Sequence, residues 1–195
     1  DTPLIIKVAS IPKERMQVYF IDNEDYFKRK AALRNEEGEL FEDNDERMLF
    51  FTKGVIETVK KLNWSPDIIH LHGWFTSLFP LYLKKYYKDE PLFEQCKIVS
   101  SIYPQDFDGP LAGDLHKKVA FDELEADVIQ GLTDPTYEQL LNFNVTYSDG
   151  FVLAGETLPA PIVAAIKASK KPVLDYKTSQ TEKAYVDFYT DKIAL

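Results

Sequence analysis

Cysteine is nearly absent from the sequence, because Cys96 is the single thiol among 195 residues. A lone thiol cannot form an internal disulfide, and no group of cysteines and histidines has the spacing of a metal site. Cys96 comes just before an apolar, strand-like run, so we expect a buried structural thiol rather than a nucleophile. Since there is neither a disulfide framework nor a secretory segment, we expect a reducing, cytoplasmic compartment.

Long apolar runs and an excess of positive charge are also missing. The longest apolar runs, such as 151–154, fall far short of the ~20 residues that a membrane span needs. The 23 basic and 32 acidic residues give a formal net charge of −9, whereas nucleic acids and anionic membranes attract basic surfaces. We therefore expect no nucleic-acid partner and no membrane partner. A hydrophobic fraction of 45% is nevertheless ample for a packed core.

The beginning of the sequence lacks the strand, glycine-rich turn and helix with which a parallel α/β domain usually opens. The chain starts at Asp1, and a strand-like run at 4–9 follows almost at once. A second strand is predicted at 17–21, and a short helix near 24–32. We therefore expect a single domain over 1–195, cut from a longer protein and missing its opening βα unit.

Strands and helices alternate along the rest of the chain. We predict strands at 67–71, 97–102, 149–154 and 172–174, and helices at 45–62, at 75–87, from 134 onward, around 162–166 and at 181–193. Helices of ten or more residues between strands indicate βαβ units. The predicted fold class is therefore α/β with a mainly parallel sheet.

Residue types at the helix ends predict where several helices begin. Asn44 is expected to cap the helix at 45–62, and Asp134-Pro135 to start a later helix. Glu156, close to another helix start, is expected to act as a cap rather than as a catalytic carboxylate. The helix at 45–62 is expected to bury one apolar stripe, formed by Met48, Phe51, Val55, Val59 and Leu62.

Ligands of parallel sheets bind at the carboxyl ends of the strands, so the stretches after Leu71, Ile102 and Ala154 matter most. His70 and His72 stand two residues apart on a strand and therefore point to the same face. His72, at the strand end, is the better functional candidate, while His70 is expected to be a buried, hydrogen-bonded core residue. The third histidine, His116, lies in another segment, so we expect no metal site.

Asp106 and Asp108 follow the second of these strands and would form a carboxylate pair suited to acid/base or cation chemistry. Aspartates in such a loop more often form turns, because their side chains satisfy local backbone groups, and we favour the turn. A glycine-rich phosphate loop of the P-loop or GxGxxG type is not present. From these residues alone we therefore assign no catalytic group.

Several stretches together resemble bacterial glycogen synthases and starch synthases, which are glucosyltransferases of the two-domain GT-B architecture. The matching pieces are Val18-Tyr19-Phe20-Ile21-Asp22-Asn23, Asp43-Asn44-Asp45-Glu46-Arg47 with Phe50-Phe51, and Pro66-Asp67-Ile68-Ile69-His70-Leu71-His72 with Trp74. They keep their order and cover roughly residues 1–105, and a weaker match runs from Ser148 to the end. The resemblance implies a Rossmann-like three-layer αβα fold, that of the N-terminal domain of a GT-B glycosyltransferase, here without the second GT-B domain. It also implies ADP-glucose and an α-1,4-glucan as substrates, and no cofactor.

The chain departs from the family at positions expected to touch these ligands. The family's His-Asp-Trp-His is here His72-Gly73-Trp74-Phe75, and its Thr-Ile-His-Asn is here Ser101-Ile102-Tyr103-Pro104. A Gly-Leu-Tyr segment appears as Ala31-Ala32-Leu33, and the Lys-x-Gly-Gly donor loop has no counterpart. The resemblance implies His72, Gly73, Trp74 and Tyr103 as ligand-binding residues and leaves no catalytic residue. Glycosyl transfer needs fixed polar groups where charge develops, so we expect this chain to be inactive by itself.

Three functions stay open on this basis. The chain would be part of a working glucosyltransferase that other segments complete. It would alternatively be a non-catalytic glucan-binding, nucleotide-binding or regulatory module, in which Trp74, Phe75 and Tyr103 stack on sugars. The competing explanation is that Trp74 and Phe75 are simply packed in the core. As an interaction scaffold, it would form a homodimer through an exposed sheet edge.

Overall fold

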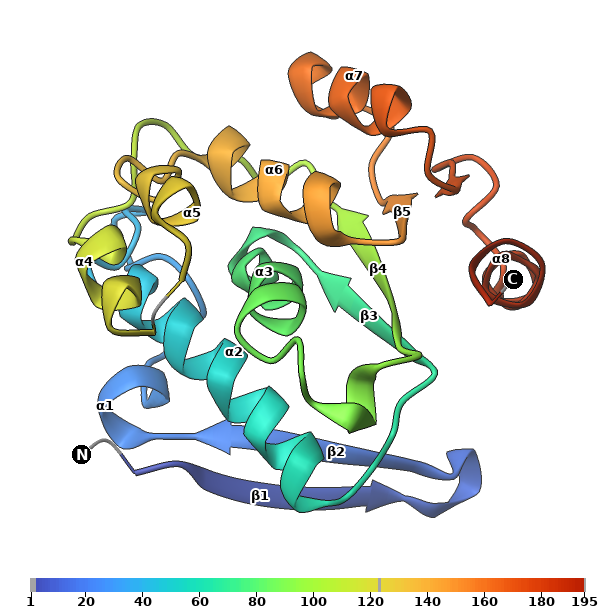
Figure 1. The fold of residues 1–195 in the computed structure, drawn as a ribbon, viewed down its shortest axis with the longest axis horizontal. Helices are drawn as coiled ribbons and strands as arrows, with labels where there is room; N and C mark the ends of the chain where they lie inside the picture. The colour runs from blue at the N-terminus through green and yellow to red at the C-terminus, as the bar shows by residue number, and fades with distance from the viewer. Residues whose placement is uncertain (1–2, 123, 195) are drawn as a thin grey trace.

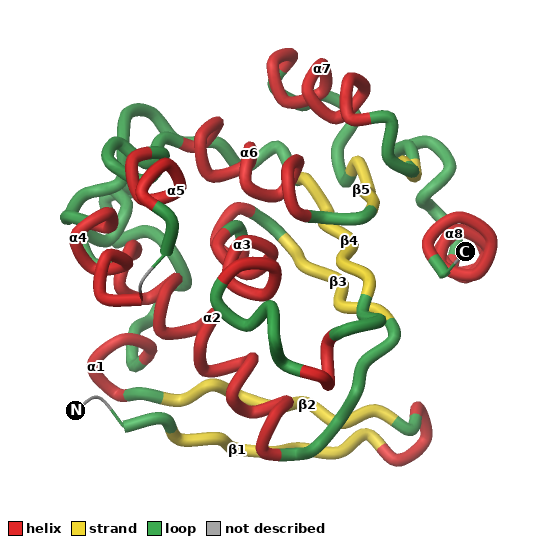
Figure 2. The backbone as a smooth tube through the Cα atoms, in the orientation of Figure 1, coloured by secondary structure: helices red, strands yellow, loops and turns green. Residues whose placement is uncertain are grey.

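The computed structural model describes residues 3–122 and 124–194, which form two separate β-sheets (Figures 1 and 2). The first sheet is an antiparallel hairpin of β1 (Ile5–Ile11) and β2 (Met16–Asp22), joined by a 3₁₀ turn at Pro12–Glu14. Both strands were predicted, although their pairing with each other, apart from the main sheet, was not. Helix α2 lies across this hairpin (Figure 1).

The second sheet has four parallel strands in the order β3-β4-β5-β6. They are β3 (Ile68–His72), β4 (Lys97–Ile102), β5 (Gly150–Leu153) and β6 (Val173–Leu174). The predicted mainly parallel sheet is therefore confirmed, and the predicted strand at 97–102 has the observed bounds. Among the described residues no strand pairs with the outer edge of β3.

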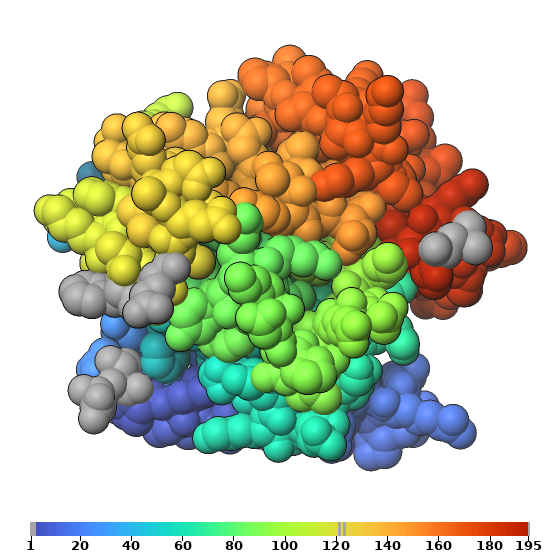
Figure 3. All heavy atoms as spheres, viewed as in Figure 1, coloured from blue at the N-terminus to red at the C-terminus, as the bar shows by residue number. Residues whose placement is uncertain are grey.

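Helices cover both faces of the parallel sheet, which confirms the predicted Rossmann-like αβα arrangement. The helices are α1 (Glu24–Phe27), α2 (Asn44–Lys61), α3 (Leu78–Lys85), α4 (Leu115–Val119), α5 (Ala126–Gln130), α6 (Tyr137–Tyr147), α7 (Ala160–Ser169) and α8 (Glu182–Phe188). A π-helical turn at Tyr189–Ile193 continues α8. This C-terminal segment lies at the opposite end of the molecule from α4 and α5 (Figure 3). Within the part of the chain that is described, no helix is both long and apolar enough to cross a membrane.

The alternation of side chains along β4 divides the interior into two cores. Ile98 and Ile102 belong to the larger core, which α2, α3, α6 and α7 help to form. Val99, between them, points to the other face and packs in a smaller core with Phe188 and Ile193 of the C-terminal segment. Since successive strand residues face opposite sides, each core takes alternate residues of the same strand.

Helix α2 begins at Asn44, so the prediction that Asn44 caps it is wrong. Asp43 is the N-cap residue, and the amide of Asn44 instead donates to the carbonyl of Leu33, at 3.0 Å. The predicted apolar stripe is confirmed only in part, because Met48 is buried while Leu62 is 46% exposed. A helix packed between a hairpin and a sheet buries more than one stripe, and α2 also buries polar residues.

Two other predicted helix starts are also wrong. Helix α6 is capped by Thr136, whose side chain and that of Gln139 form a reciprocal capping box, so the helix starts later than Asp134-Pro135. Glu156 does not cap α7, because that helix begins at Ala160 and Glu156 is exposed in the bend before it. Each local sequence contains more than one residue type that can cap a helix, and the path of the backbone determines where the helix begins.

Cys96 is buried, as predicted, with 2% of its surface exposed. Burial raises the pKa of its thiol to about 11. A thiol in this state is protonated at neutral pH and is a poor nucleophile.

A buried ion pair joins α2 to α4, beside the loop that precedes α4. Asp45 is fully buried and accepts hydrogen bonds from the backbone N–H of Glu46, at 2.7 Å, and from Nζ of Lys118, at 2.6 Å. Gly113 covers this carboxylate with φ at +89°, and a β-carbon there would lie 2.4 Å from Asp45 Oδ2. The ion pair therefore requires glycine at this position, for both its backbone conformation and its small size.

We expect Gly113→Ala to lower the free energy of unfolding by about 2–4 kcal/mol, because left-handed strain adds to the displacement of a buried, paired carboxylate. Gly109→Ala is the matched control, since Gly109 also has positive φ but no atom within 4 Å of an added β-carbon. The control should lose only about 1 kcal/mol. Urea unfolding of both variants measures the difference, and equal losses would contradict the role of Asp45.

Candidate functional site

The carboxyl ends of β3 and β4 meet at one edge of the sheet, where the predicted ligand-binding residues lie. The parallel register places His72 beside Ser101, and the backbone N–H of Gly73 donates to the carbonyl of Ser101, at 3.2 Å. Gly73 has φ at +76°, which turns the chain from β3 toward α3. An added β-carbon at Gly73 would find only Gln105 Oε1 nearby, at 3.7 Å, so the space in front of this turn is open.

Five side chains at this edge, which we call the histidine cluster, form two hydrogen-bonded groups whose imidazole rings stack on each other. They are His70, His72, Ser101, Tyr103 and Tyr189. The bonds join His70 Nδ1 to the Tyr189 hydroxyl at 2.5 Å, His70 Nε2 to Ser101 Oγ at 2.7 Å, and His72 Nδ1 to the Tyr103 hydroxyl at 2.9 Å. The two imidazole rings stack with centroids 4.3 Å apart, which confirms that they share one face. His70 is hydrogen-bonded through both nitrogens, as predicted, although it is half-buried rather than fully buried.

The histidines of this cluster are kept neutral by their surroundings. Burial, and to a smaller extent the neighbouring His72, lowers the pKa of His70 to about 4. Burial also lowers the pKa of His72, and it raises the pKa of Tyr103. At neutral pH the cluster therefore presents hydrogen-bonding groups rather than charge.

Trp74 packs in the core and at the same time borders the open space beside Gly73. Only 3% of its surface is exposed, and its ring meets Phe107 edge-on at 4.9 Å. The alternative in which Trp74 is a packed first-turn residue is therefore the observed arrangement. Its indole lines a hollow of about 460 Å³ whose other walls come from residues 31–35, Leu40, Gln105 and Asp106.

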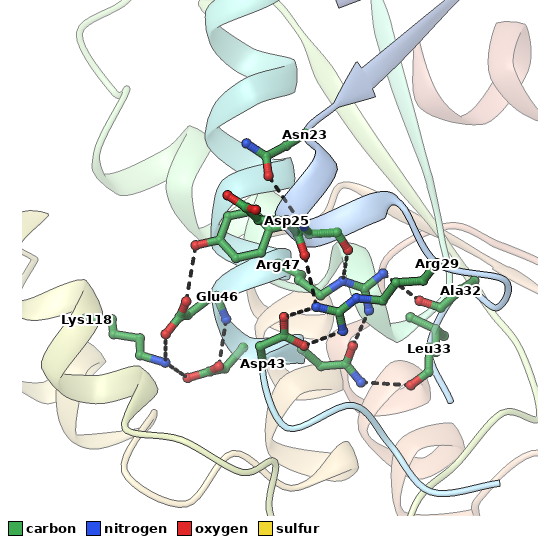
Figure 4. Close-up of polar contacts among 12 residues, drawn as sticks. Asn23, Asp25, Arg29, Ala32, Leu33, Asp43, Glu46, Arg47 and Lys118 are labelled. Carbon is green, nitrogen blue, oxygen red and sulfur yellow. Dashed lines mark hydrogen bonds and ion pairs between the residues drawn. The ribbon is translucent and has the colours of Figure 1, made fainter. Parts of the chain in front are cut away.

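Residues 31–35, which form one wall of this hollow, are held in place by Arg47 (Figure 4). Arg47 is 3% exposed and donates to the carbonyls of Tyr26, at 2.9 Å, and Ala32, at 2.7 Å. Its third partner is the side chain of Asn44. Arg29 adds an ion pair to Asp43 in the same cluster. Because one buried guanidinium satisfies acceptors in α1, in the loop after it and on α2, it fixes the path of the chain toward the hollow.

Asp106 and Asp108 lie exposed in the loop that follows β4, and that loop bends at 108–109. The backbone carbonyl of Asp106 accepts a hydrogen bond from Arg34, at 3.2 Å, which ties this loop to the opposite wall of the hollow. Among the described residues no group of three or more His, Cys, Asp or Glu side chains is arranged to hold a metal ion. His116, on α4, does not join the histidine cluster.

Tyr189 is the residue of the cluster that sequence reasoning missed. It lies 119 positions beyond His70 in the chain. The signal that would have pointed to it is the i, i+4 spacing of Tyr185 and Tyr189, which puts two tyrosines on one face of the C-terminal helix. Both rings lie near His70, with centroids 6.2 and 5.8 Å away.

Comparison with known proteins identifies a family to which this chain is similar. Residues 2–160 match the family described as the starch synthase catalytic domain. The chain is similar to glycogen synthase of Chlorobium luteolum, with 38% identity over 122 residues that cover 62% of this chain and 25% of the relative. It is 32% identical to glycogen synthase of Chlorobaculum parvum over 148 residues, which cover 75% of this chain and 30% of that relative. The chain thus spans roughly a quarter to a third of the length of these relatives.

We expect the protein to lose stability as the pH falls from about 6.5 toward 4, because His70 is neutral when folded and takes up a proton when unfolded. The stability is fully present above the ordinary histidine pKa of ~6.5, and by pH 4.5 the loss should reach roughly 1–2 kcal/mol after allowance for partial exposure. Urea unfolding at several pH values measures it. His70→Gln should show a smaller slope over this range, and equal slopes would contradict the assignment.

Proposed function

The chain belongs to the starch synthase catalytic domain family, and on this premise we propose that it is a glycogen synthase-like glycosyltransferase domain that binds its ligands at the ends of β3 and β4. The proposed ligands are a nucleotide sugar of the ADP-glucose type and an α-1,4-glucan. The proposal includes a single domain over residues 1–195 and a cytoplasmic location. The ligand-binding residues proposed are His72, Gly73, Trp74 and Tyr103.

The observation that carries this proposal is the open hollow of about 460 Å³ that Trp74 and Gln105 line, after the ends of β3 and β4. Gly73 adjoins it through Gln105, whereas His72 lies at the same sheet edge but does not line the hollow. The side-chain amides of Gln105 and Asn35 line it as neutral groups with defined hydrogen-bonding directions, and the indole of Trp74 gives an apolar wall. Sugar rings offer hydroxyls at their rim and apolar C–H faces, so a small concave site with few oriented polar groups suits them.

The same geometry favours binding over transfer by these residues alone. Glucosyl transfer develops negative charge on the leaving phosphate, which a fixed cation or several donors must stabilise. Arg34 is the cation that lines the hollow, and its terminal nitrogens already donate to the carbonyls of Gly38, at 2.8 Å, and Asp106. We therefore propose that the 195 residues bind ligand but do not transfer glucose without further protein.

A non-catalytic glucan-binding or regulatory module is the second candidate, and it uses the same hollow. The two candidates differ in the nucleotide sugar, because a glucan module has no use for the donor. Separate titrations with donor and acceptor distinguish them.

Calorimetric titration with ADP-glucose and, separately, with a maltooligosaccharide tests the proposal. We expect at least one of them to bind, and Gln105→Ala to weaken that binding about 3–10-fold, the effect of one lost hydrogen bond. Gln95→Ala is the matched control, because Gln95 is also exposed but lies on the loop before β4, away from the hollow. Binding of neither ligand, or an equal effect of both variants, would overturn the proposal.

The homodimer stays a prediction. The groove beside the outer edge of β3 has a volume of about 500 Å³ and is lined mainly by apolar side chains, including Phe51, Val55 and Trp64. If a second copy covers this edge, light scattering at high protein concentration should give twice the monomer mass, and Val55→Asp should restore the monomer. A monomer at all concentrations would count against the dimer.

A further inference from the structure

A second hollow, of about 630 Å³, lies between β2, the segment 29–33 and α2, and we call it the basic hollow. Its lining combines aromatic rings with positive charge. The aromatic residues are Tyr19, Phe20, Phe27, Phe51 and Phe75, and the charged residues are Arg29, Lys30 and Arg47. None of the described residues that line it carries a carboxylate, although acidic residues outnumber basic ones by 32 to 23 in the chain. The charge of this hollow is therefore opposite in sign to that of the whole chain.

Two guanidinium groups share a single carboxylate at this place. Figure 4 shows Arg29 and Arg47 beside each other, and Asp43 accepts hydrogen bonds from both terminal nitrogens of Arg29. Arg47 donates only to neutral acceptors, namely two backbone carbonyls and the amide oxygen of Asn44. Burial, and then the like charge of Arg29, lower the pKa of Arg47. One positive charge thus stays uncompensated in a partly buried position, where it favours the approach of an anion.

The acidic residues at the start of α2 do not remove this charge. Asp45 and Glu46 both pair with Lys118, with oxygen–nitrogen distances of 2.6 and 2.8 Å. Neither carboxylate lines the basic hollow. The excess of positive charge is therefore local to Arg29 and Arg47.

Lys30 adds a cation that is free to turn toward a ligand. Its side chain is 91% exposed, and its ion pair with Glu36 is long, at 3.6 Å, and equally exposed. An exposed pair of this kind contributes little to stability, so exchanging Glu36 for an anionic ligand costs little.

The aromatic residues give the hollow flat apolar walls. Phe27 and Phe75 hold the guanidinium of Arg47 over their rings, at 5.4 and 5.6 Å from the ring centroids. Phe20, on β2, is 53% exposed and has a ring face available for contact. Flat rings of this kind stack on any nucleic-acid base, because every base has a π-face. The volume also lies in the range of roughly 300–1,000 Å³ that is usual for small-molecule sites.

We propose that the basic hollow is a second ligand site, which binds a small anion carrying a flat ring, the chemistry of a nucleoside monophosphate. The phosphate would lie toward Arg29 and Lys30, and the ring against the aromatic walls. This site is additional to the one in the proposed function, because neither Trp74 nor Gln105 lines it. The lining residues that the two hollows share are Ala31, Ala32 and Leu33.

Calorimetric titration of the chain with adenosine monophosphate, with adenosine and with inorganic phosphate tests the proposal. We expect the monophosphate to bind at least about 5-fold more tightly than either part of it, because only the whole molecule uses both the cations and the rings. Raising the ionic strength from about 0.05 to about 0.5 M should weaken its binding, because salt screens the exposed cation. No binding of the monophosphate, or equal affinity for the monophosphate and one of its parts, would overturn the proposal.

One pair of variants tests the cation. Lys30→Ala should weaken binding of the monophosphate about 2–5-fold, the effect of one exposed ion pair. Lys28→Ala is the matched control, because Lys28 is also exposed and paired with a glutamate, Glu24, but does not line the hollow. Equal effects of the two variants would contradict the assignment.

A second pair tests the aromatic wall. Phe20→Leu should weaken binding about 5-fold or more, because the stacking surface is lost while an apolar side chain remains. Met16→Leu is its control, since Met16 lies on the same face of β2 and is 48% exposed but is not part of the lining. Backbone amide spectra show whether each variant keeps the fold, and a folded Phe20→Leu variant with unchanged affinity would count against stacking.

Gln105→Ala separates this proposal from the proposed function. It should leave the affinity for the monophosphate unchanged, because Gln105 belongs to the other hollow. If Gln105→Ala weakened this binding and Lys30→Ala did not, the nucleotide would lie at the strand ends and the second site would be refuted. A failure of ADP-glucose and of the maltooligosaccharide to bind would refute the proposed function alone.

Discussion

The parallel pairing of β3 with β4 is the constraint on which the candidate site depends. Its register sets His70 beside Val99 and His72 beside Ser101, and it brings both strand ends to one edge. A slip of one residue would turn both imidazoles to the other face of the sheet. The buried aliphatic residues on alternate positions of β4 oppose such a slip, because each of the two cores accepts only one set of them. Hydrophobic packing thus specifies the position of the polar groups.

The site is assembled from segments that are far apart in the sequence, and each is held by a different kind of interaction. The strand ends are held by backbone pairing. The wall of the hollow formed by residues 31–35 is held by the buried guanidinium of Arg47 (Figure 4). The C-terminal segment is held by apolar packing of Phe188 and Ile193, and it adds the hydroxyl of Tyr189. Backbone pairing, a buried guanidinium and apolar packing thus each position a different part of the site.

The fold could largely be predicted from the sequence, because periodicity and strand–helix alternation are local properties. The strand at 97–102 and the shared face of the two histidines follow from the two-residue repeat of a strand alone. The predictions of helix caps failed where tertiary contacts determine which residue caps the helix. The side-chain amide of Asn44, for example, donates to the carbonyl of Leu33 rather than capping its own helix. Tyr189 could not be placed beside His70 from the sequence, because the spacing of Tyr185 and Tyr189 indicates a shared helix face but not the strand that this face contacts, 119 positions away. The residues at the strand ends were predictable, and the groups that orient them were not.

The long separation between β4 and β5 has a consequence for the order of folding. The β1–β2 hairpin closes over a few residues, a step that takes microseconds in small proteins. Pairing β4 with β5 must first close the intervening chain from 103 to 149, at a larger entropic cost. The contact between His70 and Tyr189 closes a still longer loop. The histidine cluster is therefore expected to form late, so that a chain released early from the ribosome or trapped part-way would hold a hairpin and helices but no binding site.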